Sequence, residues 1–246
     1  MKILVCITHV PDTTSRINFI DNNTRFDTSG VQFIIGPYDD YALARAIEIK
    51  ESNAGTTVTV LNVGLAETEP TIRKALAIGA DDAVRVNAAP TDSVFVATQI
   101  AAHAKTVNYD LILMGRESID YNSGVVHGLV GEMLGIPSVS PVMKLELQGN
   151  KATLAREIEG GKEFAEVNLP FVAGCQEPIA EWKIPNMRGI MSARTKPLQV
   201  IEAVASDSGL QLQKFELPPP KGSVKMISAD NMTELVNLLK NEARVI

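Results

Sequence analysis

The chain has 246 residues, with 23 Lys and Arg against 29 Asp and Glu, so its formal net charge is −6. This length suits one large α/β domain with an appendage and excludes a peptide module. The acidic balance argues against a broad electrostatic grip on nucleic acid or on anionic lipid. Apolar residues make up 45% and aromatic residues 5% of the chain, which predicts an aliphatic core of the kind that surrounds buried parallel sheets.

The first half of the chain alternates short apolar runs with amphipathic segments. Strands are expected at residues 2–9, 57–63, 83–86 and 111–114. Helices are expected after Gly36-Pro37, with Asp39 or Asp40 as the cap, and at residues 71–78, 92–106 and 124–134. Asp92 is expected to cap the third helix. Strands that alternate with helices indicate right-handed βαβ units and a parallel sheet with helices on both faces.

Two further regions predict antiparallel structure. Residues 17–20 and 31–35 flank turn residues, which predicts a small hairpin arm. After Pro137, the runs 142–147, 152–158 and 164–169 are separated by Gly149-Asn150 and Gly160-Gly161, which predicts hairpins. Residues 170–174 are then expected to return to the main sheet. The predicted fold is a three-layer, doubly wound α/β/α domain with a mainly parallel sheet and antiparallel hairpins.

The C-terminal part predicts an extended arm. Residues 176–225 show little periodicity and carry many prolines, and an amphipathic helix is expected at residues 228–242. Long unstructured loops are uncommon inside compact domains. We therefore expect an α/β domain over residues 1–175 and an arm over residues 176–246 that embraces another subunit. The alternative is a long loop folded back on its own domain.

The two cysteines and the absence of a long apolar run indicate in which cellular compartment the protein is expected. Cys6 and Cys175 lie far apart, in no CxxC pair and beside no histidine, which argues against a metal site or a redox dithiol. Buried thiols of this kind are usual in a reducing compartment. No apolar run approaches the about 20 residues that cross a bilayer, and no small-residue cleavage site follows the first strand. We expect a cytoplasmic protein without membrane insertion.

Ligands of open parallel sheets bind beyond the carboxyl ends of the strands. Four segments are expected there: residues 6–10, 36–40, 63–65 and 115–126. The last lies between a buried strand and a helix start, whose free N–H groups can bind phosphate. Ser123 can cap the helix or donate to phosphate, and Gly124 permits close approach. Asp120 suits a ribose hydroxyl or a cap better than a phosphate. A capped loop without ligand remains the alternative.

Catalytic motifs are absent from the sequence. It has neither GxGxxG nor GxxxxGK[ST], and it lacks GxSxG and a Cys–His pair. Of the three histidines, His103 is expected on a half-buried or solvated helix face, while His127 lies in a first helical turn and could face a nucleotide. By spacing alone Arg156-Glu157 is a solvated charge pair, and Trp182 is an interface anchor or local packing.

Six segments, in order and at matching spacing, resemble the β subunit of electron transfer flavoprotein, which has an adenine nucleotide α-hydrolase-like fold. They are the first strand and residues 36–40, 71–81, 115–120, 156–161 and 184–186. The resemblance implies a heterodimer with a larger α subunit that holds most of an FAD. It implies electron transfer from dehydrogenases, such as acyl-CoA dehydrogenases, to a quinone reductase or another acceptor, with no catalytic residue on this chain.

The resemblance also implies an AMP in the β subunit. Its contacts would be Cys6, Gly36, Pro37, Tyr38, Asp39 and Val63, followed by Gly115, Arg116, Glu117, Ser118, Ile119, Asp120, Tyr121, Asn122, Ser123, Gly124, Val125 and Val126. Glu157 matches a carboxylate that pairs with an arginine of the α subunit, which at a partly exposed interface is worth on the order of 1 kcal/mol. Ile184, with Pro185 and Asn186, matches the apolar tip that anchors dehydrogenases.

The sequence departs from the family pattern at three places. The family's loop carries a string of acidic residues and then Gln-Thr-Gly, whereas this chain has Asp120-Tyr121-Asn122-Ser123-Gly124-Val125-Val126-His127. Met187-Arg188-Gly189 interrupts the anchoring segment. Residues 10–13 look like the electron-bifurcating branch, where a second FAD replaces AMP, but Tyr121-Asn122 does not match that branch. AMP, a second FAD and an empty site stay open. A stand-alone adenine-nucleotide-binding regulator is a further alternative, disfavoured by the proline-rich arm.

Overall fold

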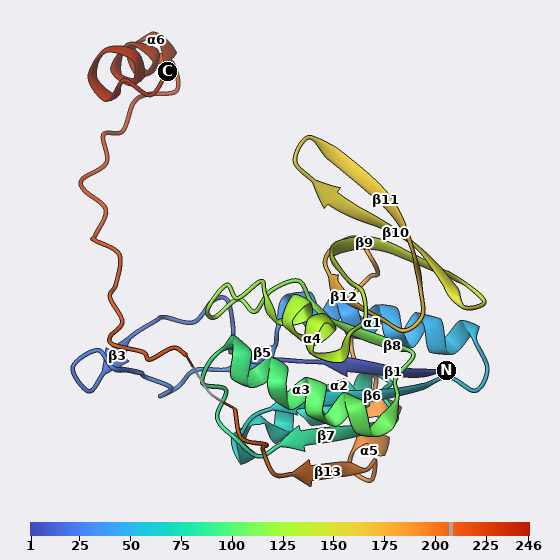
Figure 1. Ribbon diagram of the computed structural model, residues 1–246. Helices are drawn as coiled ribbons and strands as arrows, with labels where there is room; N and C mark the ends of the chain where they lie inside the picture. The colour runs from blue at the N-terminus through green and yellow to red at the C-terminus, as the bar shows by residue number, and fades with distance from the viewer. Residues whose placement is uncertain (207–208) are drawn as a thin grey trace. The chain divides into compact units, whose positions relative to one another are not determined.

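The structure, a computed structural model, describes residues 1–206 and 209–246 (Figure 1). By their contacts the residues fall into two units. The sheet unit comprises Met1–Asn18 and Asp27–Leu212, and the arm unit comprises Phe19–Phe26 and Gln213–Ile246. The boundary expected after residue 175 stays a prediction.

The sheet unit is built on one large sheet. Within the described residues it has nine strands in the order β11-β10-β9-β12-β8-β1-β6-β7-β13. The strands that run parallel to their neighbours are β1 (Lys2–Cys6), β6 (Thr57–Val63), β7 (Asp82–Val86), β8 (Leu111–Gly115), β12 (Phe171–Cys175) and β13 (Leu198–Ile201). The edge hairpins are β9 (Ser138–Gln148), β10 (Lys151–Ile158) and β11 (Gly161–Asn168), which pair antiparallel, while β9 joins β12 in parallel. The predicted hairpins and the return of the chain to the main sheet are confirmed.

Helices cover both faces of the sheet, as predicted. Alternate side chains of β1 point to opposite faces, so Ile3 and Val5 pack in one cluster while Leu4 and Cys6 pack in another. The first cluster includes residues of α1 (Pro37–Ser52) and α2 (Glu69–Ile78), the second residues of α3 (Ser93–Val107) and α4 (Val126–Leu134). A short turn, η1 (Ala66–Thr68), precedes α2. The predicted fold class, three-layer α/β with a mainly parallel sheet, is confirmed.

The structure overturns two sequence predictions about where helices are capped. Gly36 precedes α1 with Pro37 at its first position, and no side chain caps it, so neither Asp39 nor Asp40 is the cap. Helix α4 begins after Val125, also without a side-chain cap, so Ser123 does not cap it. The cap at Asp92 is confirmed, because its carboxylate accepts from the main-chain N–H groups that open α3.

The N-terminal arm pairs differently from the prediction. β2 (His9–Pro11) pairs antiparallel with β5 (Phe33–Ile35), and in the arm unit β3 (Phe19–Ile20) pairs with β4 (Arg25–Phe26). The expected pairing of residues 17–20 with 31–35 is therefore wrong. The reason is local: Asp21, Asn22 and Asn23 all adopt positive φ and turn the chain at once.

Residues 176–225 contain regular structure that the sequence analysis missed. They form α5 (Met187–Ala193) and β13, which adds to the sheet edge beside β7. Arg73 secures the connection by donating to the carbonyls of Ala193 and Lys196, both at 2.9 Å. A seven-residue helix and a four-residue strand are too short to carry a period, so only their long-range partners reveal them.

The arm unit holds the terminal helix. α6 (Met232–Asn237) continues into η2 (Leu238–Ala243), and Asn231 caps α6, so the helix starts later than the predicted residue 228. Phe215 stacks on Phe19 at 4.6 Å between ring centroids and donates its N–H to Asn23 O at 2.7 Å. Over the described residues, no helix combines the length and apolarity that crossing a membrane requires.

Candidate functional site

The fold brings the predicted ligand segments to one edge of the sheet. β1 lies between β6 and β8, and the chain covers one face with α1 and α2 before it crosses to the other with α3 and α4. Strand order therefore switches beside β1, which is where open α/β sheets bind ligands. Cys6, Val63 and Gly115 are the last residues of β1, β6 and β8. We call this place the strand-end site.

Asp39 joins the segments of the strand-end site. Its buried carboxylate accepts from the Thr8 N–H at 2.8 Å and the Thr8 hydroxyl at 2.6 Å through Oδ2. Oδ1 accepts from the Gly115 N–H at 2.8 Å. Burial raises the pKa of Asp39 to about 6, although these hydrogen bonds favour the charged form. The carboxylate thus ties the ends of β1 and β8 to the start of α1, and a direct contact with a cofactor stays a prediction.

Two glycines allow this close packing. A Cβ on Gly36 would lie 2.3 Å from Thr8 Oγ1 and 2.6 Å from Asp39 Oδ2. A Cβ on Gly115 would lie 2.6 Å from Asp39 Oδ1 and 2.7 Å from Tyr38 Cβ. Any side chain at either position would displace Asp39, so the strand-end site requires glycine at both.

Arg116 follows Gly115 and is held from three sides. Its guanidinium lies 4.8 Å from the centroid of the Tyr38 ring and donates to the Tyr38 hydroxyl at 3.1 Å. It also donates to Glu117 at 3.1 Å and to Gln176 Oε1 at 3.0 Å. Gln176 in turn donates to the Glu157 carboxylate at 2.6 Å. Sequence reasoning missed Gln176, because nothing in the local pattern marks an amide whose partners come from the loop after β8 and from β10.

The rest of the loop is organised by its own polar groups. The Ser118 hydroxyl bonds the Asp120 carboxylate, which also accepts from the Tyr121 N–H at 2.9 Å. Ser118 and Ser123 form a β-bridge, and the Ser123 hydroxyl contacts that of Ser93 at the start of α3. The remaining residues of the loop are exposed or half-buried: Ile119, Asn122, Gly124, Val125 and Val126. Whether they contact a nucleotide stays a prediction.

Burial lowers the pKa of all three histidines, which favours the neutral imidazole near pH 7. His127 opens α4 with Nδ1 at 3.3 Å from Ser138 Oγ. His9 has Nδ1 at 2.8 Å from Thr71 Oγ1 and stacks on Phe33. His103 is half-buried, one of its two expected settings, with Nε2 at 2.9 Å from the Tyr109 hydroxyl.

Several buried polar atoms at the strand-end site have no partner among the described residues. They are Asn62 Oδ1, Arg85 Nε and Arg116 Nε. Asn62 and Arg85 lie beside Val63, since Asn62 precedes it and Arg85 donates to Gly64 O at 3.0 Å. Buried polar atoms are normally paired. A ligand that offers both donors and acceptors, as adenine and ribose do, suits this site.

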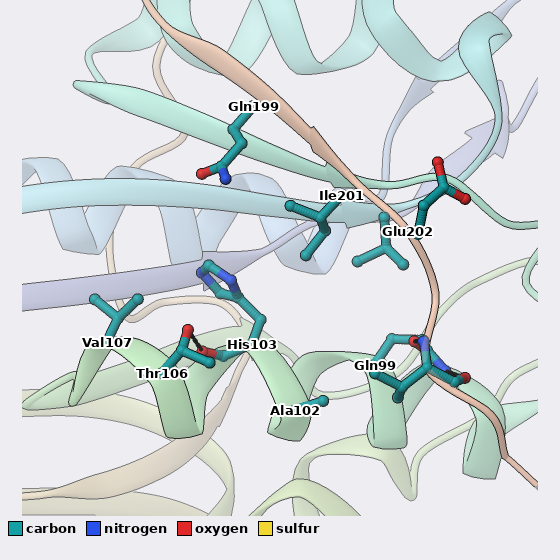
Figure 2. Close-up of a pocket in the computed structure, with 10 residues that line it drawn as sticks. Gln99, Ala102, His103, Thr106, Val107, Gln199, Ile201 and Glu202 are labelled. Atoms are coloured by element: carbon teal, nitrogen blue, oxygen red, sulfur yellow. Dashed lines mark hydrogen bonds between the residues drawn. The ribbon is translucent and has the colours of Figure 1, made fainter.

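A cavity elsewhere in the sheet unit is less suited to a nucleotide. It has a volume of about 290 Å³ and lies between α3 and the edge strand β13 (Figure 2). Gln99 and His103 line it together with Val86 and Ile201. The Gln99 amide is already engaged with both main-chain groups of Val204, and His103 with Tyr109. No group of three or more metal-ligating side chains gathers anywhere in the described part of the chain.

The segment predicted to anchor a partner opens α5. Ile184 is 76% exposed, whereas the Asn186 side chain caps the helix by accepting from the Gly189 N–H at 2.8 Å. Met187 and Met191 are 73% and 69% exposed and lie one helical turn apart. Residues 187–189 are thus the first turn of α5. A Cβ on Gly189 would lie 2.2 Å from Ala77 O, so this glycine lets α5 pack against α2.

The whole chain is similar to proteins of one family. The model of the electron transfer flavoprotein domain matches residues 24–206. The chain is 34% identical to the electron transfer flavoprotein subunit beta of Syntrophomonas wolfei, an alignment that covers 100% of this chain and 98% of the relative. It is also 34% identical to the subunit beta of Bacillus subtilis, with 100% of both chains covered. The chain belongs to the electron transfer flavoprotein β-subunit family.

Membership of this family makes the chain an electron-transfer subunit and implies an α subunit as its partner. It also implies that a flavin takes part. A further relative, 30% identical over 99% of this chain and 98% of its own, is the caffeyl-CoA reductase-Etf complex subunit CarD of Acetobacterium woodii. The relatives of this chain therefore include one named as part of a reductase-Etf complex.

Proposed function

We propose that the chain is the non-catalytic half of a heterodimeric electron carrier. In this proposal the FAD held with the α subunit accepts electrons from a dehydrogenase, such as an acyl-CoA dehydrogenase in fatty acid oxidation. It passes them to a quinone reductase or another acceptor. The full-length similarity to chains named electron transfer flavoprotein subunit beta carries the proposal. A cytoplasmic location is part of it, supported by two buried free thiols.

We infer that the strand-end site takes an adenine nucleotide, AMP by preference. The unpaired Asn62 Oδ1 and the side chains of Arg85 and Arg116 offer an acceptor and donors to a base or ribose. The main-chain N–H groups that open α4 lack a side-chain cap, which favours an anion there. A second FAD presents the same adenosine and α-phosphate and is the alternative ligand.

The residues of the strand-end site have binding and positioning roles in this proposal. The flavin supplies the electron-carrying chemistry when it is bound with the α subunit. Asp39 holds the strand ends together, and Arg116 is fixed in direction by Tyr38 and Gln176. Glu157 is exposed on β10 and is proposed to pair with an arginine of the α subunit.

Nucleotide content tests the proposal. The chain is co-expressed with the α subunit of its source organism, the complex is denatured, and FAD and AMP are quantified per heterodimer. One FAD and one AMP are expected. A colourless chain that never pairs with an α subunit would reject the proposed function.

Two FAD per heterodimer would instead favour an electron-bifurcating subunit. The segment Val10-Pro11-Asp12-Thr13, which resembles the electron-bifurcating branch, supports this second candidate. It begins within β2, four residues after the end of β1 at Cys6. The relative named as a subunit of a reductase complex is compatible with it. The segment 10–13 would then be the first to mutate.

A further inference from the structure

Gln176 occupies an unusual electrostatic position. Its side chain is only 6% exposed, and each end of its amide meets an ionised group. Oε1 accepts from the Arg116 guanidinium at 3.0 Å, and Nε2 donates to the Glu157 carboxylate at 2.6 Å. The amide is thus a neutral bridge between a cation and an anion that do not touch each other.

The charges on either side fix the direction of the amide. A flipped amide would place its NH₂ group against the guanidinium, where both are donors, and its oxygen against the carboxylate, where both are acceptors. Both contacts would change from attractive to repulsive. Hydrogen bonds to charged groups are also the stronger class. Gln176 therefore has one orientation, and it imposes that orientation on whichever partner is free to move.

Glu157 is the partner that is free to move. It is exposed on β10, opposite Lys162 near the end of the hairpin, and Gln176 is the donor that the structure records for it. Arg116, by contrast, is held by Tyr38, Glu117 and Gln176 together. A long exposed side chain loses rotamer freedom when a partner binds it, and a side chain already held loses less.

We propose that Gln176 is a positioning residue for partner binding: it holds the Glu157 carboxylate in one orientation, anchored through Arg116 to the strand-end loop. This inference rests on the proposed function, in which Glu157 pairs with a cation of the α subunit. It adds that the pairing group and the loop Gly115–Val126 form one hydrogen-bonded unit. A change at Arg116 then reaches Glu157 through Gln176.

A double-mutant cycle on α-subunit affinity tests the proposal. Gln176→Met keeps the length of the side chain and removes both hydrogen bonds. We expect it to weaken binding of the α subunit by up to about fivefold, which is the whole contribution of a partly exposed ion pair. In a Glu157→Gln background it should have less than about a twofold effect, because coupled groups are not additive. In a Glu159→Gln background, the matched control on the same hairpin, the full effect should persist.

A charge-swapped variant separates positioning from folding. Gln176→Glu combined with Glu157→Gln rebuilds the bridge, since Arg116 donates to the new carboxylate and the new amide donates to it as well. Thermal stability should return to that of the wild type. Binding of the α subunit should stay at the level of Glu157→Gln, because the exposed carboxylate is gone.

A spectroscopic measurement tests the bridge in the chain without its partner. In NMR spectra, the side-chain NH₂ signals of Gln176 can be assigned by their loss in Gln176→Met. Their chemical shifts should change in Glu157→Gln and in Arg116→Lys but not in Glu159→Gln. The proposal would be overturned if Gln176→Met weakened binding equally in the wild type and in the Glu157→Gln background. It would also be overturned if the charge-swapped variant bound the α subunit as tightly as the wild type does. If the wild type binds no α subunit, the proposed function fails, whereas the amide signals still report on the bridge.

Discussion

At the scale of single residues, Asp39 shows how a buried charge organises a site. Its carboxylate accepts from Thr8 and Gly115, which lie 31 and 76 residues away in the chain. Burial raises its pKa to about 6, so ionisation at neutral pH costs free energy that the three hydrogen bonds offset only in part. The strand-end site is therefore held by a group whose charge depends on pH.

We predict that Asp39→Asn changes both stability and its pH dependence. The folded pKa of about 6 exceeds the ordinary value, so the folded state binds the extra proton and stability falls as pH rises through about 6. Asp39→Asn should remove this fall, which amounts to at most about 3 kcal/mol. Below about pH 5 it should cost about 1–3 kcal/mol relative to the wild type, because the amide NH₂ cannot accept from an N–H, and this cost should shrink as pH rises through about 6.

Urea unfolding at a series of pH values checks this prediction. Asp40→Asn is the matched control, because burial also raises the pKa of Asp40 to about 6 while its nearest recorded cation is Lys74 at 3.8 Å. The control should alter the pH dependence without the loss at low pH, because Asp40 does not accept the hydrogen bonds that Asp39 accepts from Thr8 and Gly115. If the free energy of unfolding depended on pH in the same way for the wild type and for Asp39→Asn, the role given to Asp39 would be contradicted.

The glycines beside Asp39 give a second prediction. Gly36→Ala and Gly115→Ala should each lower the free energy of unfolding by about 1–3 kcal/mol, because the added methyl group displaces Asp39. Gly128→Ala, in α4 with no atom within 4 Å of its Cβ position, should be neutral or stabilising by up to about 1 kcal/mol. Denaturant titration of the three variants measures this, and equal effects would refute the crowding argument.

At the scale of elements, α5 presents exposed apolar side chains next to the segment predicted to anchor a partner. Ile184 precedes the helix, and Met187 and Met191 lie on one of its faces, all three largely exposed. Exposed apolar side chains in a group mark interaction surfaces more often than isolated ones do. We therefore define the anchor surface as Ile184, Met187 and Met191.

We predict that Ile184→Ala and Met187→Ala each slow electron transfer from the donor dehydrogenase and leave flavin content unchanged. Each truncation removes apolar area that the partner would bury, at about 25 cal/mol per Å². Stopped-flow reduction of the complex by the dehydrogenase measures the effect. Val200→Ala, a 49% exposed apolar residue on β13, is the control and should have no effect. Unchanged rates in both anchor variants would exclude α5 from this contact.

At the scale of the whole molecule, the chain consists of two units with different kinds of surface. The sheet unit buries two continuous aliphatic clusters. The arm unit has no fully buried side chain, and its Leu217, Val224 and Met226 are 59%, 78% and 86% exposed. A group of apolar side chains this exposed is typical of an interaction surface, and we propose that the α subunit buries them.

We predict that a chain ending at Leu212 keeps the stability of the sheet unit but binds the α subunit more than about tenfold more weakly, a loss of at least about 1.4 kcal/mol. The reason is that the clusters of the sheet unit contain no residue beyond 203. Circular dichroism melting and a binding titration check the two parts. Removal of residues 244–246 alone is the control. Undiminished affinity in the truncated chain would show that the arm does not embrace the partner.

The local sequence pattern was enough to predict the layers of the fold and to predict which segments lie at the edge of the sheet where a ligand would bind. Strand and helix periods state which side chains are buried, and alternation of the two forces a parallel sheet. The roles of Asp39, Gln176 and β13 appeared only in three dimensions. Their partners are brought together by chain folding, since Arg116 and Gln176 are 60 residues apart. A hydrogen bond between residues far apart in the chain produces no repeating pattern in the sequence, so it cannot be predicted from any one segment.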